Sequence, residues 1–273
     1  MATLNAFLIC LACCCWQPTL SHAQTTDTLR WQLKKHIAGE FTTFTADKLG
    51  NVYLINANNQ IKKLNQQLDS VGLYNDVKRF GNIAAIDVSN PLKILVYYRK
   101  YAAIAILDRF LNYRTTINLR QQNLLQVKCM AQSFDNHIWL FDEWDNKVKK
   151  MNDAGNIVQE FTDCRLLFDQ PFSPNSIVDA DGLVYLYHPE VGFKVFNYLG
   201  ALMHQYPLLH WKDVHVSNGL LIGRDNQYQY TWQPKQLLQT QKAAAWNNAL
   251  QVVYQQNHCY VLRNDGLYIY QLL

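Results

Sequence analysis

Asp47-Lys48-Leu49-Gly50-Asn51-Val52-Tyr53-Leu54-Ile55-Asn56, followed after a short polar stretch by Ile61-Lys62-Lys63-Leu64-Asn65, decides the fold because the chain repeats it. The second copy is 135–142 with 148–152, and the third is 181–188 with 193–197. Each copy reads as a tight turn, a strand, a second turn and another strand. A self-similar period of roughly 40 residues is typical of β-propellers. The repeat therefore predicts the architecture and leaves the activity open, because propellers include enzymes, receptors and scaffolds.

The rest of the sequence fits the same unit of four strands, which we name A to D from the innermost to the outermost. Six units are expected, with B strands beginning at Val52, Ile94, Ile138, Val184, Leu220 and Cys259. In the second unit we expect strand A at 82–88, and in the fifth unit strand D at 236–240. The prediction is an all-β, six-bladed β-propeller that occupies residues 24–273 as a single domain.

The last unit has sequence for only three strands, at 250–254, 259–262 and 267–272. The stretch 29–37 alternates apolar and polar residues, as a half-buried strand does. We therefore expect this N-terminal stretch to supply the missing outer strand of the last blade. Such a closure removes the exposed edges that an open sheet presents.

The first 23 residues predict export. They contain no Asp, Glu, Lys or Arg, run apolar from Ala6 to Trp16 and end in Ser21-His22-Ala23, which fits a secretory signal cleaved before Gln24. Two alternatives stay open, a retained membrane anchor and lipid attachment at Cys13, Cys14 or Cys15. We expect an exported protein of the periplasm or the cell-envelope surface, with no membrane span in the mature chain.

Cysteine content and charge exclude several classes of function. Outside the signal only Cys129, Cys164 and Cys259 occur, an odd number without metal-ligand spacing, so buried thiols are expected and not a disulfide framework or a zinc site. The net charge of +4 is spread among the units. We therefore expect no nucleic-acid partner and no polybasic membrane patch.

In a four-stranded meander, the B–C turns and the D–A connections emerge on one side of the propeller. Aromatic and charged residues gather in these segments, and such residues are enriched at binding hot spots. The candidate binding residues are Arg99, Tyr101, Trp144, His188, Trp211, Arg224 and Trp246. The open alternative is that these aromatic residues cap the blade ends. We expect a non-catalytic binding or scaffolding module that engages a protein partner of the cell envelope, without a cofactor.

The repeat Asp-x-x-Gly-Asn-apolar-Tyr resembles that of NHL-type and gluconolactonase (regucalcin)-like six-bladed propellers. The resemblance implies an alternative function, a metal-dependent lactonase or esterase. Gluconolactonase-like propellers bind a divalent cation through Glu, Asn and Asp near the starts of inner strands. The matching positions are Glu40, Asn82, Asn175 and Asp213, and Pro174-Asn175 resembles the Pro-Asn of that family.

In that alternative, one Ca²⁺ or Mg²⁺ ion at the channel mouth would polarise a lactone or ester carbonyl. The competing interpretation is that these polar residues only solvate the channel. A third possibility is carbohydrate binding through Trp144, Trp211 and Trp246. No nucleophile-elbow, zinc-protease or nucleotide-binding motif is present in the sequence.

Overall fold

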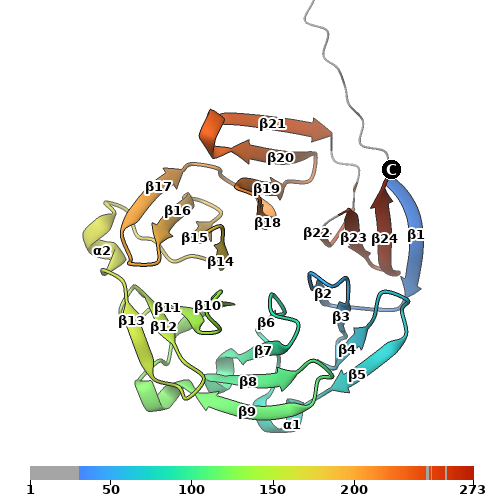
Figure 1. Ribbon diagram of the computed structural model, residues 1–273, viewed down its shortest axis with the longest axis horizontal. Helices are drawn as coiled ribbons and strands as arrows, with labels where there is room; N and C mark the ends of the chain where they lie inside the picture. The colour runs from blue at the N-terminus through green and yellow to red at the C-terminus, as the bar shows by residue number, and fades with distance from the viewer. Residues whose placement is uncertain (1–30, 244–245, 247, 256) are drawn as a thin grey trace, which may run out of the picture.

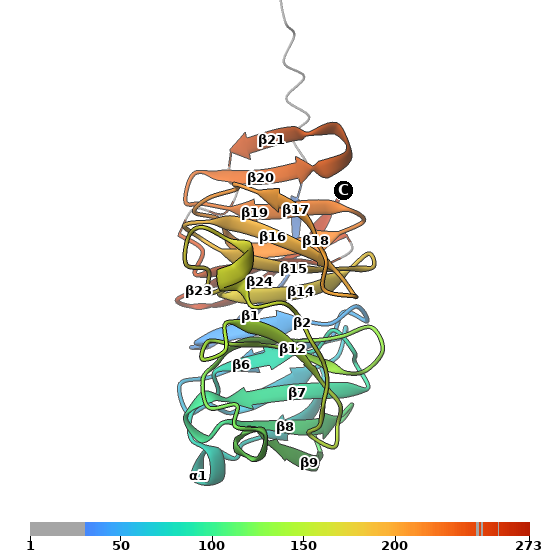
Figure 2. The same cartoon turned by 90° about the vertical axis from the view of Figure 1, so that its left-hand side faces the viewer.

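Six four-stranded antiparallel sheets stand around a central axis (Figure 1). This computed structural model describes residues 31–243, 246, 248–255 and 257–273. Seen from the side, the sheets form a disc (Figure 2). The predicted six-bladed β-propeller is confirmed. The signal-peptide prediction and the cysteines that go with it lie outside the described residues.

The blades follow one another along the chain. Blades 1 to 3 are β2 (Thr43–Ala46), β3 (Val52–Ile55), β4 (Ile61–Leu64) and β5 (Ser70–Tyr74); β6 (Ala85–Asp87), β7 (Lys93–Tyr98), β8 (Ala103–Asp108) and β9 (Tyr113–Asn118); and β10 (Val127–Gln132), β11 (Ile138–Asp142), β12 (Lys147–Met151) and β13 (Ile157–Glu160). Blades 4 to 6 are β14 (Ser176–Ala180), β15 (Leu183–His188), β16 (Gly192–Asn197) and β17 (Leu202–Tyr206); β18 (Lys212–Ser217), β19 (Leu220–Arg224), β20 (Tyr228–Gln233) and β21 (Leu238–Ala243); and β22 (Gln251–Gln255), β23 (His258–Arg263), β24 (Gly266–Leu272) and β1 (Trp31–Ala38).

The predicted strands agree with these bounds except at two places. The inner strand of blade 2 covers only Ala85–Asp87 of the expected 82–88. The outer strand of blade 5 begins at Leu238 because Pro234–Gln236 forms the short 3-10 helix η3, with proline at its first position. Proline suits the first position of a helix because a backbone N–H at that position would have no partner within the helix.

The ring closes through the N-terminal strand, as predicted. β1 pairs antiparallel with β24, from Trp31 opposite Leu272 to Ala38 opposite Gly266, with a register shift between Leu33 and Lys35. Strands from the two ends of the chain therefore share one sheet, at the right of Figure 1. The closing strand is part of the fold.

An Asn or Asp at the end of the C strand recurs in blades 1 to 4, as Asn65, Asp108, Asn152 and Asn197. In blade 3 the Asn152 side-chain oxygen accepts hydrogen bonds from the backbone N–H groups of Ala154 and Asn156, at 3.1 and 2.9 Å. In blade 4 Asn197 accepts from Leu199 and Ala201 in the same way. This side chain replaces a backbone partner within the C–D turn, a role that Asn and Asp fill well.

The core lies between the blades. Val52, Leu54 and Leu64 pack toward blade 6, whereas Ile61 packs toward blade 2. Alternate side chains of one strand thus serve two junctions, because successive residues of a strand point to opposite faces. Within the described ranges Cys129, Cys164 and Cys259 are free and buried, as expected. No helix of these ranges is long and apolar enough to cross a membrane.

Polar side chains near the axis join neighbouring blades. Asp87 of blade 2 accepts a hydrogen bond from the backbone N–H of Gln132 in blade 3, at 2.9 Å. Across the closing junction, the side chain of Gln251 in blade 6 both accepts from and donates to the backbone of Phe44 in blade 1. The inner polar residues therefore do more than solvate a channel, because they satisfy the backbone of the adjacent blade.

Candidate functional site

The B–C turns and the D–A connections share one side of the disc, which we call the loop face. The N–H of Glu143, in a B–C turn, donates to Gln126, in a D–A connection, at 2.9 Å. His210 makes the same kind of contact with Pro189, at 2.7 Å. The short helix α1 (Val77–Phe80) also belongs to this face, on the left of Figure 2. The A–B and C–D turns form the opposite side, which we call the turn face.

Four of the seven predicted binding residues lie on the loop face with accessible side chains. Arg99 and Tyr101 are exposed on the 3-10 helix η1 (Arg99–Tyr101), and His188 is half-buried at the end of β15. Trp144 is 72% exposed in the B–C turn of blade 3. The carboxylate of Asp142 accepts a hydrogen bond from the backbone N–H of Trp144, which fixes the turn that presents the indole.

The other three predicted residues are buried. Trp211, Arg224 and Trp246 are only 5%, 4% and 5% exposed, so the structure removes them from the accessible part of the face. Burial of the two indoles matches the alternative that aromatic residues cap the blade ends. Arg224 serves a different purpose, because it is held inside an ion pair.

The burial of Trp211 depends on Gly223. Added to Gly223, a Cβ atom would lie 2.5 Å from the Trp211 ring, so only glycine leaves room for the indole. The ring also stacks on Tyr230, the cross-strand partner of Gly223, with 5.5 Å between ring centroids and 6° between the planes. Trp246 is similarly enclosed, with Tyr270 at 4.4 Å and its Nε1–H donating to the hydroxyl of Tyr254.

The four residues of the metal alternative lie in different environments. Glu40, Asn82 and Asn175 are exposed. Asp213 is committed to the fold, since its Oδ2 accepts from Arg224 Nε at 2.6 Å and from the backbone N–H of Val252 at 2.9 Å. Burial raises the pKa of Asp213, against the opposing effect of Arg224. No group of three His, Cys, Asp or Glu side chains with metal-binding geometry occurs among the described residues.

Trp144 borders a pocket of about 340 Å³ on the loop face of blade 3. Amides and one leucine form most of its other walls, namely Gln122, Asn123, Leu125 and Gln126, with Asp145 and Lys149 completing it. Burial alone would lower the pKa of Lys149, but hydrogen bonds to Asp145 and Asp142 outweigh it and raise the pKa. Lys149 thus stays charged and holds Asp145 beside the exposed indole.

A second pocket, of about 410 Å³, lies on blade 2 beside the first. Arg79, Tyr101 and Arg120 line it. The guanidinium of Arg79 sits over the ring of Phe80, 4.6 Å from its centroid, which holds the charge at the surface. Blades 2 and 3 therefore present two adjoining regions, one rich in cations and one built around an indole.

The amide-rich pocket wall was missed from the sequence. Gln122 is the last residue of the 3-10 helix η2 (Leu119–Gln122), and Asn123 follows it. We predicted no function for this connection. A signal existed, because Arg120-Gln121-Gln122-Asn123 is a polar run between two apolar strands. Its meaning depends on Trp144, which lies in the next blade and is not adjacent in sequence.

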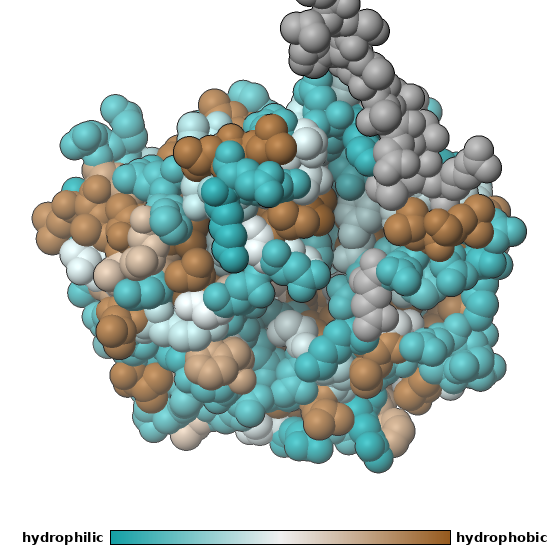
Figure 3. Space-filling model, turned by 45° about the horizontal axis from the view of Figure 1, so that its top comes forward, coloured by the Kyte–Doolittle hydropathy of each residue, from teal (hydrophilic) through white to brown (hydrophobic). Residues whose placement is uncertain are grey.

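The turn face also exposes apolar residues, which come from separate turns. Leu49, Leu92, Phe134, Leu199 and Leu237 are exposed there, each from a different turn. Figure 3 shows apolar patches separated by polar residues on this side. Exposed apolar residues scattered singly are normal and imply no partner.

Solved structures similar to this chain are β-propellers of diverse activity. Virginiamycin B lyase from Staphylococcus aureus, in a catalytically inactive form with quinupristin, is 11% identical, with a TM-score of 0.63 over 89% of this chain and 100% of that chain. The Pan2 WD40 domain from Neurospora crassa is 10% identical, with a TM-score of 0.64 over 89% of this chain and 95% of that chain.

A third similar structure is the extracellular domain of a putative hybrid two-component system from B. thetaiotaomicron. It is 16% identical, with a TM-score of 0.56 over 85% of this chain and 33% of that chain. No family model and no curated protein sequence matches the chain. At these identities the similarity shows the fold alone.

Proposed function

We propose that this chain is an exported, non-catalytic propeller that binds a protein partner through the loop face of blades 2 and 3. The observation that carries the proposal is the exposure of Trp144, at 72%, beside a pocket in an otherwise well-packed blade. Burying an indole contributes more binding energy than burying most other side chains, and tryptophan is enriched at hot spots. Export rests on the apolar N-terminal sequence.

The exposed indole is one of three exposed apolar residues from neighbouring segments of the loop face. Leu125 shares its pocket. On the other side, the short helix α2 (Cys164–Leu167) is tied to the Trp144 turn, because the N–H of Cys164 donates to Asn146 at 2.9 Å. Leu166 on this helix is exposed. Leu125, Trp144 and Leu166, which we call the apolar strip, thus come from a D–A connection, a B–C turn and the helix bonded to that turn.

Cations lie at one end of the strip. Arg79, Arg99, Lys100 and Arg120 are exposed on the loop face of blade 2. Arg99 is oriented by a hydrogen bond from its Nη2 to the carbonyl of Lys128, at 2.8 Å. An apolar centre with a charged rim is the usual anatomy of a protein interface. The arrangement suits a partner that presents an apolar segment next to acidic residues.

The test begins with the chain that starts at Gln24, used as bait for cell-envelope proteins. Each captured protein is then purified and titrated against the wild type, Leu125→Ala and Leu199→Ala. Leu199 is the matched control because it is exposed on the turn face. We expect Leu125→Ala to weaken binding at least fivefold, about 1 kcal/mol, and Leu199→Ala to leave it unchanged.

Equal loss of affinity in both leucine variants, or in neither, would refute the loop-face proposal. A parallel titration with Ca²⁺ and Mg²⁺ tests the enzymatic alternative. Tight binding of one ion per chain, together with lactone or ester hydrolysis that Glu40→Gln abolishes, would refute the scaffold proposal and support the enzymatic alternative.

One specific observation favours a second candidate, carbohydrate binding at the same pocket. An exposed indole beside the side-chain amides of Gln122, Asn123 and Gln126 provides an apolar platform with hydrogen-bonding groups at its edge. Binding of a neutral oligosaccharide to the wild type but not to Trp144→Ala, with no protein captured, would favour this candidate over the protein partner.

A further inference from the structure

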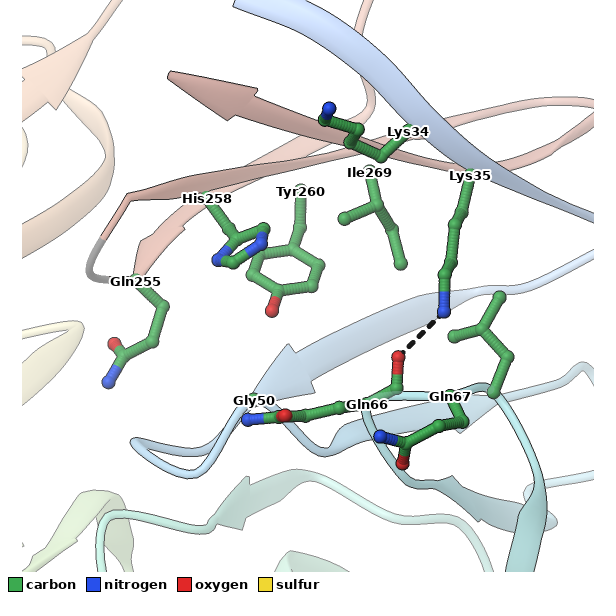
Figure 4. Close-up of a pocket in the computed structure, with 10 residues that line it drawn as sticks. Lys34, Lys35, Gly50, Gln66, Gln67, Gln255, His258, Tyr260 and Ile269 are labelled. Atoms are coloured by element: carbon green, nitrogen blue, oxygen red, sulfur yellow. Dashed lines mark hydrogen bonds between the residues drawn. The ribbon is translucent and has the colours of Figure 1, made fainter. Parts of the chain in front are cut away.

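A pocket of about 270 Å³ lies on the turn face at the seam where the ring closes. Figure 4 shows that it lies between the sheet of blade 6 and that of blade 1. Lys34 and Lys35 come from the closing strand β1, Gln255, His258 and Tyr260 from blade 6, and Gln66 from blade 1. Its walls therefore come from both ends of the chain.

The lining contains cations and amides but no carboxylate. Lys35 Nζ donates to the backbone carbonyl of Gln66 at 2.7 Å, drawn as the dashed line in Figure 4. An ammonium group has three N–H donors, so two remain for a ligand. Lys34 also lines the pocket and is exposed to solvent. The charge of the pocket is positive at neutral pH.

Tyr260 points its hydroxyl into this space (Figure 4). The residue is only 3% exposed, and the hydroxyl makes no hydrogen bond to any described residue. Burial raises the pKa of Tyr260 to about 12, helped by the negative charge of Asp47, so the phenol stays protonated. The hydroxyl is therefore a donor that points into a pocket with cationic walls.

Asp47 does not neutralise the pocket. Its Oδ1 accepts the backbone N–H groups of Leu49 and Asn51, and its Oδ2 accepts from the Asn51 amide and the hydroxyl of Tyr53. The carboxylate is buried under these four donors. Its charge is therefore satisfied by hydrogen-bond donors within blade 1.

We propose that the seam pocket binds a small molecule that carries a carboxylate or phosphate group. The oxyanion would accept hydrogen bonds from Lys35 Nζ and from the hydroxyl of Tyr260, while the side chains of His258 and Gln255 contact the remainder of the molecule. Charge-assisted hydrogen bonds of this type are the strong ones in proteins. The volume is at the lower end for ligand pockets, which suits a compact ligand. This site lies on the face opposite to the proposed partner surface and does not depend on it.

Binding at this place has a mechanical consequence. A ligand that touches β1, blade 6 and blade 1 bridges the two ends of the ring. Because such a ligand binds only the closed ring, it stabilises the folded protein by mass action. Occupancy is therefore measurable as a rise in the melting temperature.

The experiment measures the melting temperature and binding heat with sodium phosphate and with sodium citrate, against sodium chloride at equal ionic strength. The variants are Tyr260→Phe, which removes only the hydroxyl, and Lys35→Met. Lys62→Met is the control, because Lys62 is exposed on β4 of blade 1 and does not line the pocket. Phosphate tests for a ligand with a phosphate group, and citrate tests for a ligand with a carboxylate group.

We expect saturable binding of one probe per chain, weakened about fivefold by Tyr260→Phe and at least tenfold by Lys35→Met, as for loss of a neutral and of a charged hydrogen bond. Lys62→Met should match the wild type. Absence of saturable binding below about 10 mM for both probes, or equal affinity in all variants, would overturn the proposal.

Discussion

Trp144 and Trp211 both lie on the loop face of the ring, yet the first is 72% exposed and the second 5%. Trp144 stands in a B–C turn, where the chain reverses at the rim of the blade. Trp211 directly precedes an inner strand, and Gly223 on the neighbouring strand leaves space for its ring. The difference teaches that an aromatic residue of a propeller loop is available to a partner only when no small residue opposite makes room for it.

Blades 3 and 5, to which Trp144 and Trp211 belong, also differ in what stabilises their C strands. In blade 3 the buried Lys149 and Lys150 are paired with Asp142 and Asp135. In blade 5 the corresponding strand β20 carries aromatic residues instead, and Tyr230 stacks on Trp211. Lys149 therefore lies beside Trp144 in a pocket and leaves its indole exposed, whereas Tyr230 stacks on the buried indole of Trp211.

Deleting residues 24–38 should have the largest effect on stability. The deletion exposes the edge of β24 and removes Trp31, whose ring lies 6.1 Å from that of Trp246. We expect a loss of several kcal/mol out of a total of ~5–15, seen as a large fall in the denaturation midpoint. An unchanged midpoint would mean that β1 is dispensable for the ring.

Trp211→Ala should destabilise the protein by about 3–5 kcal/mol, because it empties a buried ring site. Trp144→Ala is its matched control and should change the free energy of unfolding by less than about 0.5 kcal/mol. Urea denaturation followed by circular dichroism measures both values. Similar losses in the two variants would abolish the distinction between the binding and the packing indole.

Gly223→Ala should cost about 1–3 kcal/mol, since the added methyl group forces the Trp211 ring to move. Gly219→Ala is not a suitable control because its φ of +72° strains any other residue. The increase in Trp211 exposure is measurable as stronger quenching of fluorescence by acrylamide. A variant with wild-type stability and quenching would show that Gly223 does not determine the burial of Trp211.

Asp135→Asn should cost about 1–2 kcal/mol at pH 7, because it leaves the buried Lys150 without its partner. Burial alone would raise the pKa of Asp135, but hydrogen bonds from Lys150, Ser133 and His137 hold it well below its usual range. A depressed pKa contributes stability above the unfolded value of about 4, and this contribution is lost as the pH falls through the folded value.

Denaturation of the wild type and of Asp135→Asn across pH 3–7 should therefore show a difference that is largest at pH 7 and shrinks below about pH 4. Asp153→Asn is the exposed control, since Asp153 pairs with Lys93 at the surface. A difference that does not vary with pH would rule out the ion pair as its cause.

Much of the fold was predictable from the repeat, and the reason is physical. The turn residues and the alternating strands follow local rules, so the strands and turns of a blade can be recognised from its own sequence. The exposure of Trp144 and the burial of Trp211 obey no local rule, because they depend on Gly223 and on connections from other strands. The sequence places Asp213 among the candidate metal ligands for the same reason, because its partners Arg224 and Val252 lie on other strands.

The most direct measurement is the affinity of the purified partner for Trp144→Ala and for Phe134→Ala, two exposed aromatic residues on opposite faces. Both variants must first show a wild-type circular dichroism spectrum. The loop-face proposal predicts that Trp144→Ala weakens binding at least thirtyfold, about 2 kcal/mol, while Phe134→Ala binds as the wild type does. Full affinity in Trp144→Ala, or an equal loss in Phe134→Ala, would contradict it.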